Sequence, residues 1–320
     1  MLSVLDFILL LITGLIVLGF IAVSAMFLIW WERKVSAHIQ SRLGPMRVGW
    51  HGVLQSIADA VKLLLKENII PAGADKLVWW LAPFFAVVPS VMVFVAIPFG
   101  KNLIVKDLNV GILYIMAVSS VCVLGIFMAG WGSNNKYSLL GGMRSAAQII
   151  SYELPLILSM IIVSMHAGSL SMQKIVAAQS GHWYILHPNM MLAFVVYMIS
   201  ATAEVNRVPF DIPEAESELV AGFHTEYSGM KFAMFFIGEY TNLFIISAIA
   251  TTLFFGGWHG PLLPPVAWFL IKTYGIVSIL MWVRWTFPRV RVDQLMGFAW
   301  KVLTPVSLLN LAITGWLLLK

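Results

Sequence analysis

The residues best able to carry chemistry are concentrated in one acidic stretch, between Glu204 and Glu239. The whole chain has 15 acidic residues, and seven of them fall here: Glu204, Asp211, Glu214, Glu216, Glu218, Glu226 and Glu239. Apolar segments flank the stretch, and carboxylates at a membrane edge are costly unless they have a role. Carboxylates can hold and pass protons, so proton transfer is the leading hypothesis. A solvated surface loop is the structural alternative.

The acids of this stretch are also patterned. Asp211-Ile212-Pro213-Glu214 resembles a helix capping box with a proline in the first turn. Glu214 and Glu218 are four residues apart, so they would share one face of a helix. Like charges on one face raise each other's pKa, and such carboxylates titrate as a group and can pass protons near neutral pH.

Three carboxylates lie at membrane depth. Glu153 comes eight residues into an apolar run, or ~12 Å at the rise of a helix, and Glu239 lies a similar distance from Lys231. Glu204 is at the end of its own apolar run. Acidic residues inside a membrane segment are functional by default, so the three together predict a hydrophilic path from one surface toward the middle of the membrane.

The elements that position these acids must be membrane helices. The chain of 320 residues is 60% hydrophobic and 11% charged, with a mean hydropathy of +0.89. A soluble chain would be about one quarter charged. We therefore expect an all-α polytopic membrane protein with a single membrane domain over residues 1–320. The net charge of +5 reflects basic loops rather than nucleic-acid binding.

Apolar runs predict eight transmembrane helices. They lie at about 7–30, 77–98, 108–130, 145–166, 189–204, 232–256, 266–284 and 302–319. No basic segment precedes the first run, which argues against a cleaved signal peptide. In this topology 15 of the 20 Lys and Arg residues, including all eight arginines, share one side with the acidic loop at about 204–231. That side should be cytoplasmic, which leaves both termini outside.

The segment at about 50–66 predicts an amphipathic helix at the cytoplasmic surface. Its apolar residues follow a helical stripe, and it is too polar to span. It is either a plain surface anchor or one wall of an opening for a lipid-soluble substrate.

Redox and metal chemistry have few candidate ligands. Cys122 is the one cysteine, so the chain has no internal disulfide and cannot hold an iron–sulfur cluster alone. The seven histidines form no His-x-x-x-His pair, and we expect no metal or haem site.

Three long motifs resemble one known family. The acidic stretch reads EVNRVPFD from Glu204, EAESELVAGF from Glu214, and then Glu226-Tyr227. Near the N-terminus stand Glu32-Arg33-Lys34, Gln40-x-Arg42-x-Gly44-Pro45 and Ala58-Asp59-Ala60-x-Lys62, and near the C-terminus Pro288-Arg289-x-Arg291-x-Asp293-Gln294. In order and coverage these are similar to the quinone-site membrane subunit of respiratory complex I. That family comprises the H subunit of the bacterial NADH-quinone oxidoreductase and its mitochondrial equivalent, subunit 1.

The resemblance implies a subunit of an NADH-quinone oxidoreductase that has no redox centre of its own. Quinone would be the substrate, in a chamber shared with peripheral subunits that carry the iron–sulfur clusters and flavin. Small membrane subunits, antiporter-like subunits and the lipid bilayer are the other implied partners. A glutamate chain would couple quinone reduction to proton translocation. The expected location is a bacterial inner membrane, with both termini periplasmic, rather than a mitochondrial or plastid membrane.

The resemblance also assigns residues. The implied proton relay consists of Glu153, Glu204, Glu214, Glu216, Glu218, Glu226 and Glu239. The implied quinone chamber, entry path and supporting charges are Glu32, Arg33, Gln40, Arg42, Trp50, Asp59, Lys62, Arg207, Asp211, Arg289, Arg291 and Asp293. Some relatives have a further carboxylate in the third span. Here 108–130 has no acid, and Ser119 and Ser120 are weak substitutes.

Other functions remain open at this point. A homologous anchor of an energy-converting hydrogenase would share the motifs without binding quinone. A stand-alone cation/proton transporter would explain the membrane carboxylates, but no inverted repeat is visible. A passive anchor for a peripheral enzyme would explain the basic loops but not Glu153, Glu204 and Glu239.

Overall fold

The computed structural model describes residues 4–213 and 216–319, and every regular element within these ranges is a helix. The elements are α1 (Val4–Ile39), η1 (Trp50–Gly52), α2 (Gln55–Leu65), α3 (Lys76–Val93), α4 (Gly111–Ser119), α5 (Val121–Gly132), α6 (Lys136–Ala167), α7 (Met172–Ala178), η2 (Tyr184–Leu186), α8 (Pro188–Glu204), α9 (Glu216–Leu219), η3 (Gly222–His224), α10 (Gly229–Phe254), α11 (Pro265–Thr286), α12 (Val292–Phe298), η4 (Ala299–Leu303) and α13 (Thr304–Leu318).

Within the described residues, seven helical segments are long and apolar enough to cross a membrane. They match seven of the eight expected spans. The remaining expected span, 189–204, coincides with α8, which has 17 residues and is therefore ~26 Å long. A bilayer hydrocarbon core is about 30 Å thick, so α8 is short for a spanning helix. The all-helical membrane fold is confirmed, and the count of eight spans stays a prediction.

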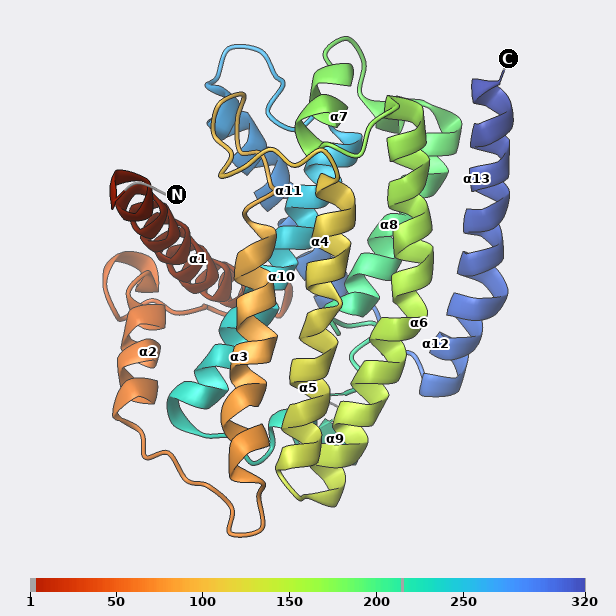
Figure 1. Ribbon diagram of the computed structural model, residues 1–320. Helices are drawn as coiled ribbons and strands as arrows, with labels where there is room; N and C mark the ends of the chain where they lie inside the picture. The colour runs from red at the N-terminus through yellow and green to blue at the C-terminus, as the bar shows by residue number, and fades with distance from the viewer. Residues whose placement is uncertain (1–3, 214–215, 320) are drawn as a thin grey trace.

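Helix α10 is the centre of the bundle (Figure 1). It packs against α1, α3, α8 and α11. From Leu243 to Phe254 every residue is buried, which is the pattern of a helix surrounded by others. Glu239 lies ten residues into α10, or ~15 Å along its axis. The fold thus carries a carboxylate into the middle of the protein.

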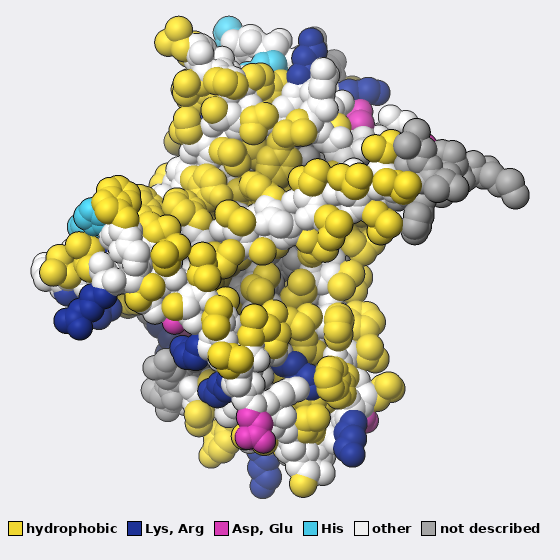
Figure 2. All heavy atoms as spheres, turned by 90° about the vertical axis from the view of Figure 1, so that its left-hand side faces the viewer, with side chains coloured by type: hydrophobic (Ala, Val, Ile, Leu, Met, Phe, Trp, Pro, Cys, Tyr) yellow, Lys and Arg dark blue, Asp and Glu magenta, His cyan; other side chains and the backbone are white. Residues whose placement is uncertain are grey.

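The ends of the bundle differ in character. In Figure 1 the marked chain ends on α1 and α13 lie in the upper half, whereas α9 of the acidic stretch lies near the bottom. Figure 2 shows many hydrophobic side chains across the upper and middle parts of the face formed by α1 and α2, with most of the visible Lys and Arg side chains in the lower half and a few at the top. This distribution fits a band of lipid around the middle.

The amphipathic segment is helical over a shorter range than expected. Helix α2 begins at Gln55, because the backbone of Gly49, His51 and Gly52 has positive φ angles of 73°, 50° and 74° and forms a separate turn. Within the segment expected to be helical at about 50–66, the regular α-helix thus begins five residues after Trp50. Four of its apolar side chains, Ile57, Val61, Leu64 and Leu65, are exposed on this chain, as is Leu54 just before the helix, whereas Leu63 is half-buried.

Two spans have interruptions that the apolar pattern did not reveal. The third span breaks at Ser120, between α4 and α5, where Ser119 Oγ and Ser120 Oγ donate to backbone carbonyls three residues back. The last span contains a π-helical turn, η4, and Asn310 on α13 donates to the Asn189 carbonyl of α8.

Lys272 has a structural role in holding the start of α11. Its Nζ atom donates to the carbonyls of Phe255 (2.7 Å), Gly257 (3.1 Å) and His259 (2.6 Å). These carbonyls follow the C-terminus of α10, where a cation is favoured by the helix dipole. The lysine therefore fastens the α10–α11 connection to α11.

Candidate functional site

A buried charge cluster joins four separate parts of the chain. Arg207 Nη1 lies 2.6 Å from Glu32 Oε2 on α1, and Arg207 Nε lies 2.7 Å from Glu239 Oε1 on α10. Arg284 on α11 donates to the other oxygen of Glu32. The Arg207 guanidinium also lies over the Tyr240 ring, 4.5 Å from its centroid. The positive charges of the two arginines therefore balance the negative charges of the two carboxylates within the protein interior.

The C-terminus of α8 positions Arg207. Asn206 adopts a left-handed φ of 54°, and its N–H donates to the Ala203 carbonyl while the Arg207 N–H donates to the Thr202 carbonyl. This pair of bonds is a Schellman motif, for which asparagine is well suited after glycine. The motif turns the chain back sharply, and so Arg207 enters the space between α1, α10 and α11.

Arg207 stays charged in this position. Burial alone would lower the pKa of its guanidinium, but the charges of Glu239 and Glu32 outweigh burial and raise the pKa above its usual range. Its side chain is only 4% exposed. A buried arginine held by two carboxylates is a fixed positive charge, so any change of charge in the cluster must fall on the carboxylates.

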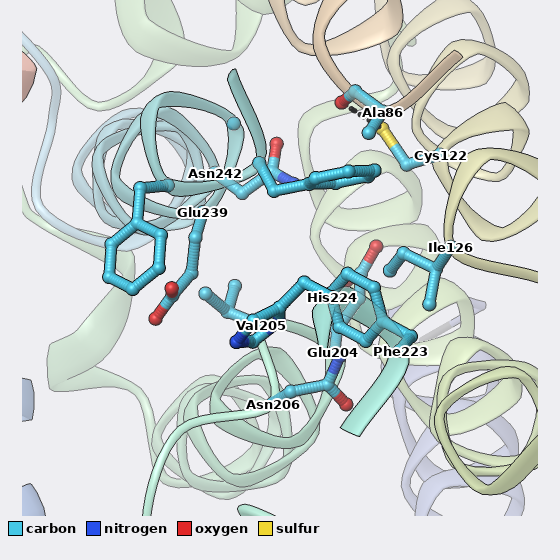
Figure 3. A pocket seen from close by; sticks show the side chains of 13 residues that line it. Ala86, Cys122, Ile126, Glu204, Val205, Asn206, Phe223, His224, Glu239 and Asn242 are labelled. Atoms are coloured by element: carbon cyan, nitrogen blue, oxygen red, sulfur yellow. Dashed lines mark hydrogen bonds between the residues drawn. The ribbon is translucent and has the colours of Figure 1, made fainter. Parts of the chain in front are cut away.

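A cavity beside the cluster contains two of the predicted relay residues (Figure 3). It has room for about 50 Å³ of water and is lined by Glu204, Glu239, Asn242 and His224, together with phenylalanines. In Figure 3 Glu239 and Asn242 lie on one side of this space, and Glu204 and His224 lie across it. A volume of this size can hold ordered water, and the polar lining supplies hydrogen-bond partners.

A second cavity adjoins the first and shares part of its lining. Glu204, Asn242 and Cys122 line both, and the second one, also about 50 Å³, reaches Ser90 and Ser119 among apolar side chains. Ser90 Oγ donates to Asn242 Oδ1 at 2.7 Å. Ser119, at the break between α4 and α5, thus lines the second cavity, whereas Glu239 lines only the first.

Glu153 is the third acid at this depth. It is half-buried on α6 and close enough to Glu204 for their charges to interact. Asp211 interacts in the same way with Glu239. The arrangement brings Glu239, Glu204 and Glu153 near one another, and their assignment to a proton relay stays a prediction.

The acids of the loop between α8 and α10 are placed differently. Glu218 Oε2 lies 2.6 Å from Arg144 Nη1 on α6, and this bond lowers the pKa of the exposed Glu218. Glu226 Oε1 accepts from Asn135 Nδ2 at 2.5 Å. Glu216 begins α9, and Glu214 lies outside the described residues. Glu218 and Glu226 therefore fasten the loop to α6 and its N-terminal cap.

The residues of the N-terminal motif lie in two places. Glu32 belongs to the charge cluster, and Arg33, Asp59 and Lys62 lie where α1 and α2 meet. Arg33 Nη1 lies 2.6 Å from Asp59 Oδ2, and Lys62 Nζ lies 3.7 Å from Asp59 Oδ1. Partial burial would raise the pKa of Asp59, but hydrogen bonds from Arg33 and Gln55 outweigh it and lower the pKa. These contacts fix α2 against α1.

The remaining motif residues lie at the surface of the described chain. Gln40, Arg42 and the 81% exposed Trp50 surround the connection from α1 to α2. In the C-terminal motif, Arg289 Nη2 donates to the Ile212 carbonyl at 3.3 Å, and Arg291 Nε lies 3.3 Å from Asp293 Oδ1 in an exposed pair. Arg289 thereby links the segment between α11 and α12 to the acidic loop.

Sequence reasoning missed four participants, namely Arg284, Tyr240, Asn242 and His224. Arg284 carries a signal that could have identified it, since a charge at the end of an apolar run has a partner more often than not. Asn242 is three residues after Glu239 and so shares its helix face. Among the described residues, no group of three or more His, Cys, Asp or Glu is arranged to hold a metal ion.

Comparisons with known proteins agree on one family. A family profile described as NADH dehydrogenase matches residues 12–315. The H subunit of NADH-quinone oxidoreductase from Dehalococcoides mccartyi is 58% identical over 301 residues, which cover 94% of this chain and 84% of that protein. One H subunit of the same enzyme from Geobacter metallireducens is 53% identical over 304 residues, covering 92% of both chains. The H subunit from Carboxydothermus hydrogenoformans is 51% identical over 305 residues, covering 94% of this chain and 86% of that protein.

Proposed function

The chain belongs to the NADH dehydrogenase family, as an H-type membrane subunit of NADH-quinone oxidoreductase, or complex I, and we propose that it couples quinone reduction to proton translocation. The relatives favour this enzyme over a hydrogenase anchor or a stand-alone transporter, because they match over most of their length. The single observation that carries the coupling proposal is the position of Arg207 between Glu32 and Glu239, beside the cavity that Glu239 shares with Glu204.

The charge cluster is suited to change its protonation when another charge appears nearby. Arg207 holds both carboxylates in a low-dielectric interior, where a new charge nearby acts strongly. A negative quinone species in the adjoining chamber would favour proton uptake by a cluster carboxylate. A proton on Glu239 would weaken its bond to Arg207 and free its side chain toward the cavity.

The cavities offer the next step of the path. Water in the space between Glu239 and Glu204 would connect the two carboxyl groups, with Asn242 as a hydrogen-bonding neighbour. Glu153 extends the series along α6. Protons would thus pass from Glu239 to Glu204 and on to Glu153, toward neighbouring membrane subunits.

The quinone side of the proposal rests on α2. Most of its large apolar side chains are exposed on this chain, next to α1 and α10. Gln40, Arg42 and Trp50 lie at the same junction, and this exposed apolar face would form one wall of the quinone entry. Since the chain has one cysteine, the iron–sulfur clusters would belong to partner subunits, and we place the flavin there as well. Peripheral quinone-site subunits would close the chamber, and antiporter-like subunits would take up the proton signal.

The proposed setting is a bacterial inner membrane. The acidic loop and all arginines would face the cytoplasm, and both termini would face the periplasm.

The test of coupling uses the assembled complex in proteoliposomes. Glu204→Gln and Glu239→Gln keep size and hydrogen bonding but cannot titrate. Each should assemble, as NADH oxidation by a water-soluble acceptor reports, yet lose at least about tenfold in both quinone reduction and pumping, which corresponds to ~1.4 kcal/mol or more. Glu67→Gln, an exposed carboxylate away from the cavities, is the matched control. Wild-type pumping in both cavity variants would refute the relay.

A further inference from the structure

A buried glutamine of α6, Gln148, holds both ends of the turn that follows α8. Its Nε2 atom donates to the carbonyls of Ala203 and Phe210, each at 2.7 Å. A side-chain amide has two N–H donors, so both are used here. The side chain is only 1% exposed, and in such an interior these bonds are stronger than they would be in water. Gln148 therefore closes the segment 203–210 into a defined loop, called here the 203–210 turn.

The 203–210 turn carries two residues of the candidate site. Glu204 lines both cavities, and Arg207 pairs with Glu32 and Glu239. Helix α8 ends at Glu204, so the backbone that follows is no longer held by the hydrogen-bond ladder of that helix. Contacts from other elements must therefore set where the Arg207 guanidinium lies.

A second side chain of α6 holds the middle of the same turn. Ser145 comes three residues before Gln148, so the two share one face of the helix. Ser145 is fully buried, and its Oγ accepts from Asn206 Nδ2 at 2.9 Å. Asn206 is the residue whose left-handed φ turns the chain back after α8. This face of α6 thus fastens the turn at its start, its middle and its end.

We propose that Gln148 is a positioning residue for proton transfer, which keeps the Arg207 guanidinium between Glu32 and Glu239 and keeps Glu204 at the cavity. The inference rests on the proposed function, because it names what holds the relay in place. Loss of Gln148 changes no charge in the cluster and alters only its geometry. In a positioned site, a misplacement of about 1 Å can reduce a rate by about 10²-fold.

The variant Gln148→Met tests this role in the assembled complex in proteoliposomes. Methionine is unbranched and of similar size, but it has no N–H to donate. Quinone reduction and pumping per assembled complex should fall by about tenfold or more. The fall should appear in kcat and leave the KM for quinone unchanged, because the exposed face of α2 is not altered. Oxidation of NADH by a water-soluble acceptor reports assembly.

A second buried glutamine supplies the matched control. Gln179 is also 1% exposed, and its Nε2 donates to the carbonyls of Ile175 and Thr252 at 3.3 and 2.9 Å. It follows α7, which lies at the top of Figure 1, whereas α9 of the acidic loop lies near the bottom. Gln179→Met should lower the melting temperature of the complex without changing turnover per assembled complex. Equal losses of turnover in the two variants would overturn the positioning role.

A double variant tests whether Gln148 acts through the Arg207–Glu239 pair. Once Glu239→Gln has removed the charge that Arg207 holds, a displaced guanidinium has less left to disturb. Gln148→Met/Glu239→Gln should therefore lose much less turnover than the product of the two single losses. Losses that multiply would show that the two side chains act independently, which contradicts the proposal.

A milder variant decides the matter if Gln148→Met does not assemble. Ser145→Ala removes only the acceptor of Asn206 Nδ2, and it should assemble and lose several-fold in quinone reduction. Ser159→Ala is its control, since Ser159 is equally buried on α6 but donates within its own helix, to the Leu156 carbonyl. In that case, wild-type turnover in Ser145→Ala would overturn the proposal.

Failure of this inference is distinguishable from failure of the relay. If Glu204→Gln and Glu239→Gln lose turnover while an assembled Gln148→Met complex keeps the wild-type rate, the relay stands and the role of Gln148 is refuted. Wild-type pumping in both glutamate variants refutes the relay itself, and the positioning role with it.

Discussion

Arg207 and Glu239 form a 2.7 Å ion pair between the end of α8 and the middle of α10, and the same guanidinium reaches Glu32 on α1. A planar guanidinium can serve two carboxylates through different nitrogens, whereas an ammonium is a point charge. This geometry makes Arg207 the common partner of two buried acids. It also means that neither acid can change charge without affecting the other.

Replacement of Arg207 should leave two buried carboxylates without their main partner. We expect Arg207→Gln to destabilise the complex by about 3–5 kcal/mol, and Arg207→Lys to recover only part of this loss. The double variant Arg207→Gln/Glu239→Gln should be less destabilised than the sum of its single variants. Thermal unfolding of the purified complex measures this, with the exposed Arg47→Gln as control. Additive losses in the double variant would show that the two residues are not coupled.

His224 should make the stability of the complex depend on pH. Burial lowers the pKa of this histidine to about 4, from an ordinary value of 6.5. Its contribution is therefore fully present above pH 6.5, where both the folded and the unfolded states hold it neutral. As the pH falls from 6.5 toward 4 only the unfolded state gains the proton, so stability declines by up to about 3 kcal/mol.

The His224→Gln variant tests this dependence, since glutamine does not titrate in this range. The melting temperature of its complex should fall less between pH 7 and pH 5 than that of the wild type. His182→Gln changes an exposed histidine and should behave as the wild type. Identical pH profiles for wild type and His224→Gln would contradict the prediction.

The membrane helices could be predicted because hydropathy is a property of a local run. Seven expected spans have counterparts, although three of these helical segments extend nine or ten residues beyond the expected bounds. One of them is α6, which starts at Lys136 because Asn135 caps it at the N-terminus, ahead of the apolar run. The sequence predicted where the amphipathic helix ends but not where it starts. The start depends on the left-handed backbone conformation of His51, which amino-acid composition does not predict.

The site was only partly predictable, for a different reason. Glu32 and Arg207 are 175 residues apart, and their pairing depends on how α1 and α8 meet α10. The sequence motifs identified Glu32 and Arg207 as candidate site residues but did not predict that they form an ion pair. Likewise, the charge pattern favoured a helical face for Glu218, whereas the structure pairs it with Arg144, a contact that only the fold creates.

The exposed apolar face of α2 should be sensitive to charge if it forms the quinone entry. Leu54 and Ile57 are 49% and 48% exposed. Leu54→Arg or Ile57→Arg places a charge on an apolar membrane face, so quinone reduction should fall severalfold while oxidation of NADH by a water-soluble acceptor survives. Leu262→Arg changes a fully exposed leucine near α11 and serves as the control. Unchanged quinone reduction in the α2 variants would leave α2 as a surface anchor.

The number of spans can be tested from the chain ends. With α8 as an eighth span, both termini face the same side, whereas seven spans would separate them. Tags at residue 1 and residue 320 should both be reachable from the periplasm, because the loops rich in Lys and Arg stay inside. Labelling of whole cells with a reagent that does not cross the membrane distinguishes the seven-span topology from the eight-span topology. Cytoplasmic labelling of either end would exclude the eight-span topology.

Lys272 lies within a membrane helix, and its three carbonyl contacts argue for a structural role rather than a place in an ion path. Lys272→Met keeps much of the apolar stem but leaves the carbonyls of Phe255, Gly257 and His259 without their shared donor. Hydrogen bonds to charged groups contribute roughly 1.5–3 kcal/mol, so we expect a loss of stability of about that size. Quinone reduction per assembled complex should stay near the wild-type rate. The exposed Lys101→Met controls for loss of a positive charge on the same side of the membrane. A stable Lys272→Met complex that fails to pump would instead place this lysine on the ion path.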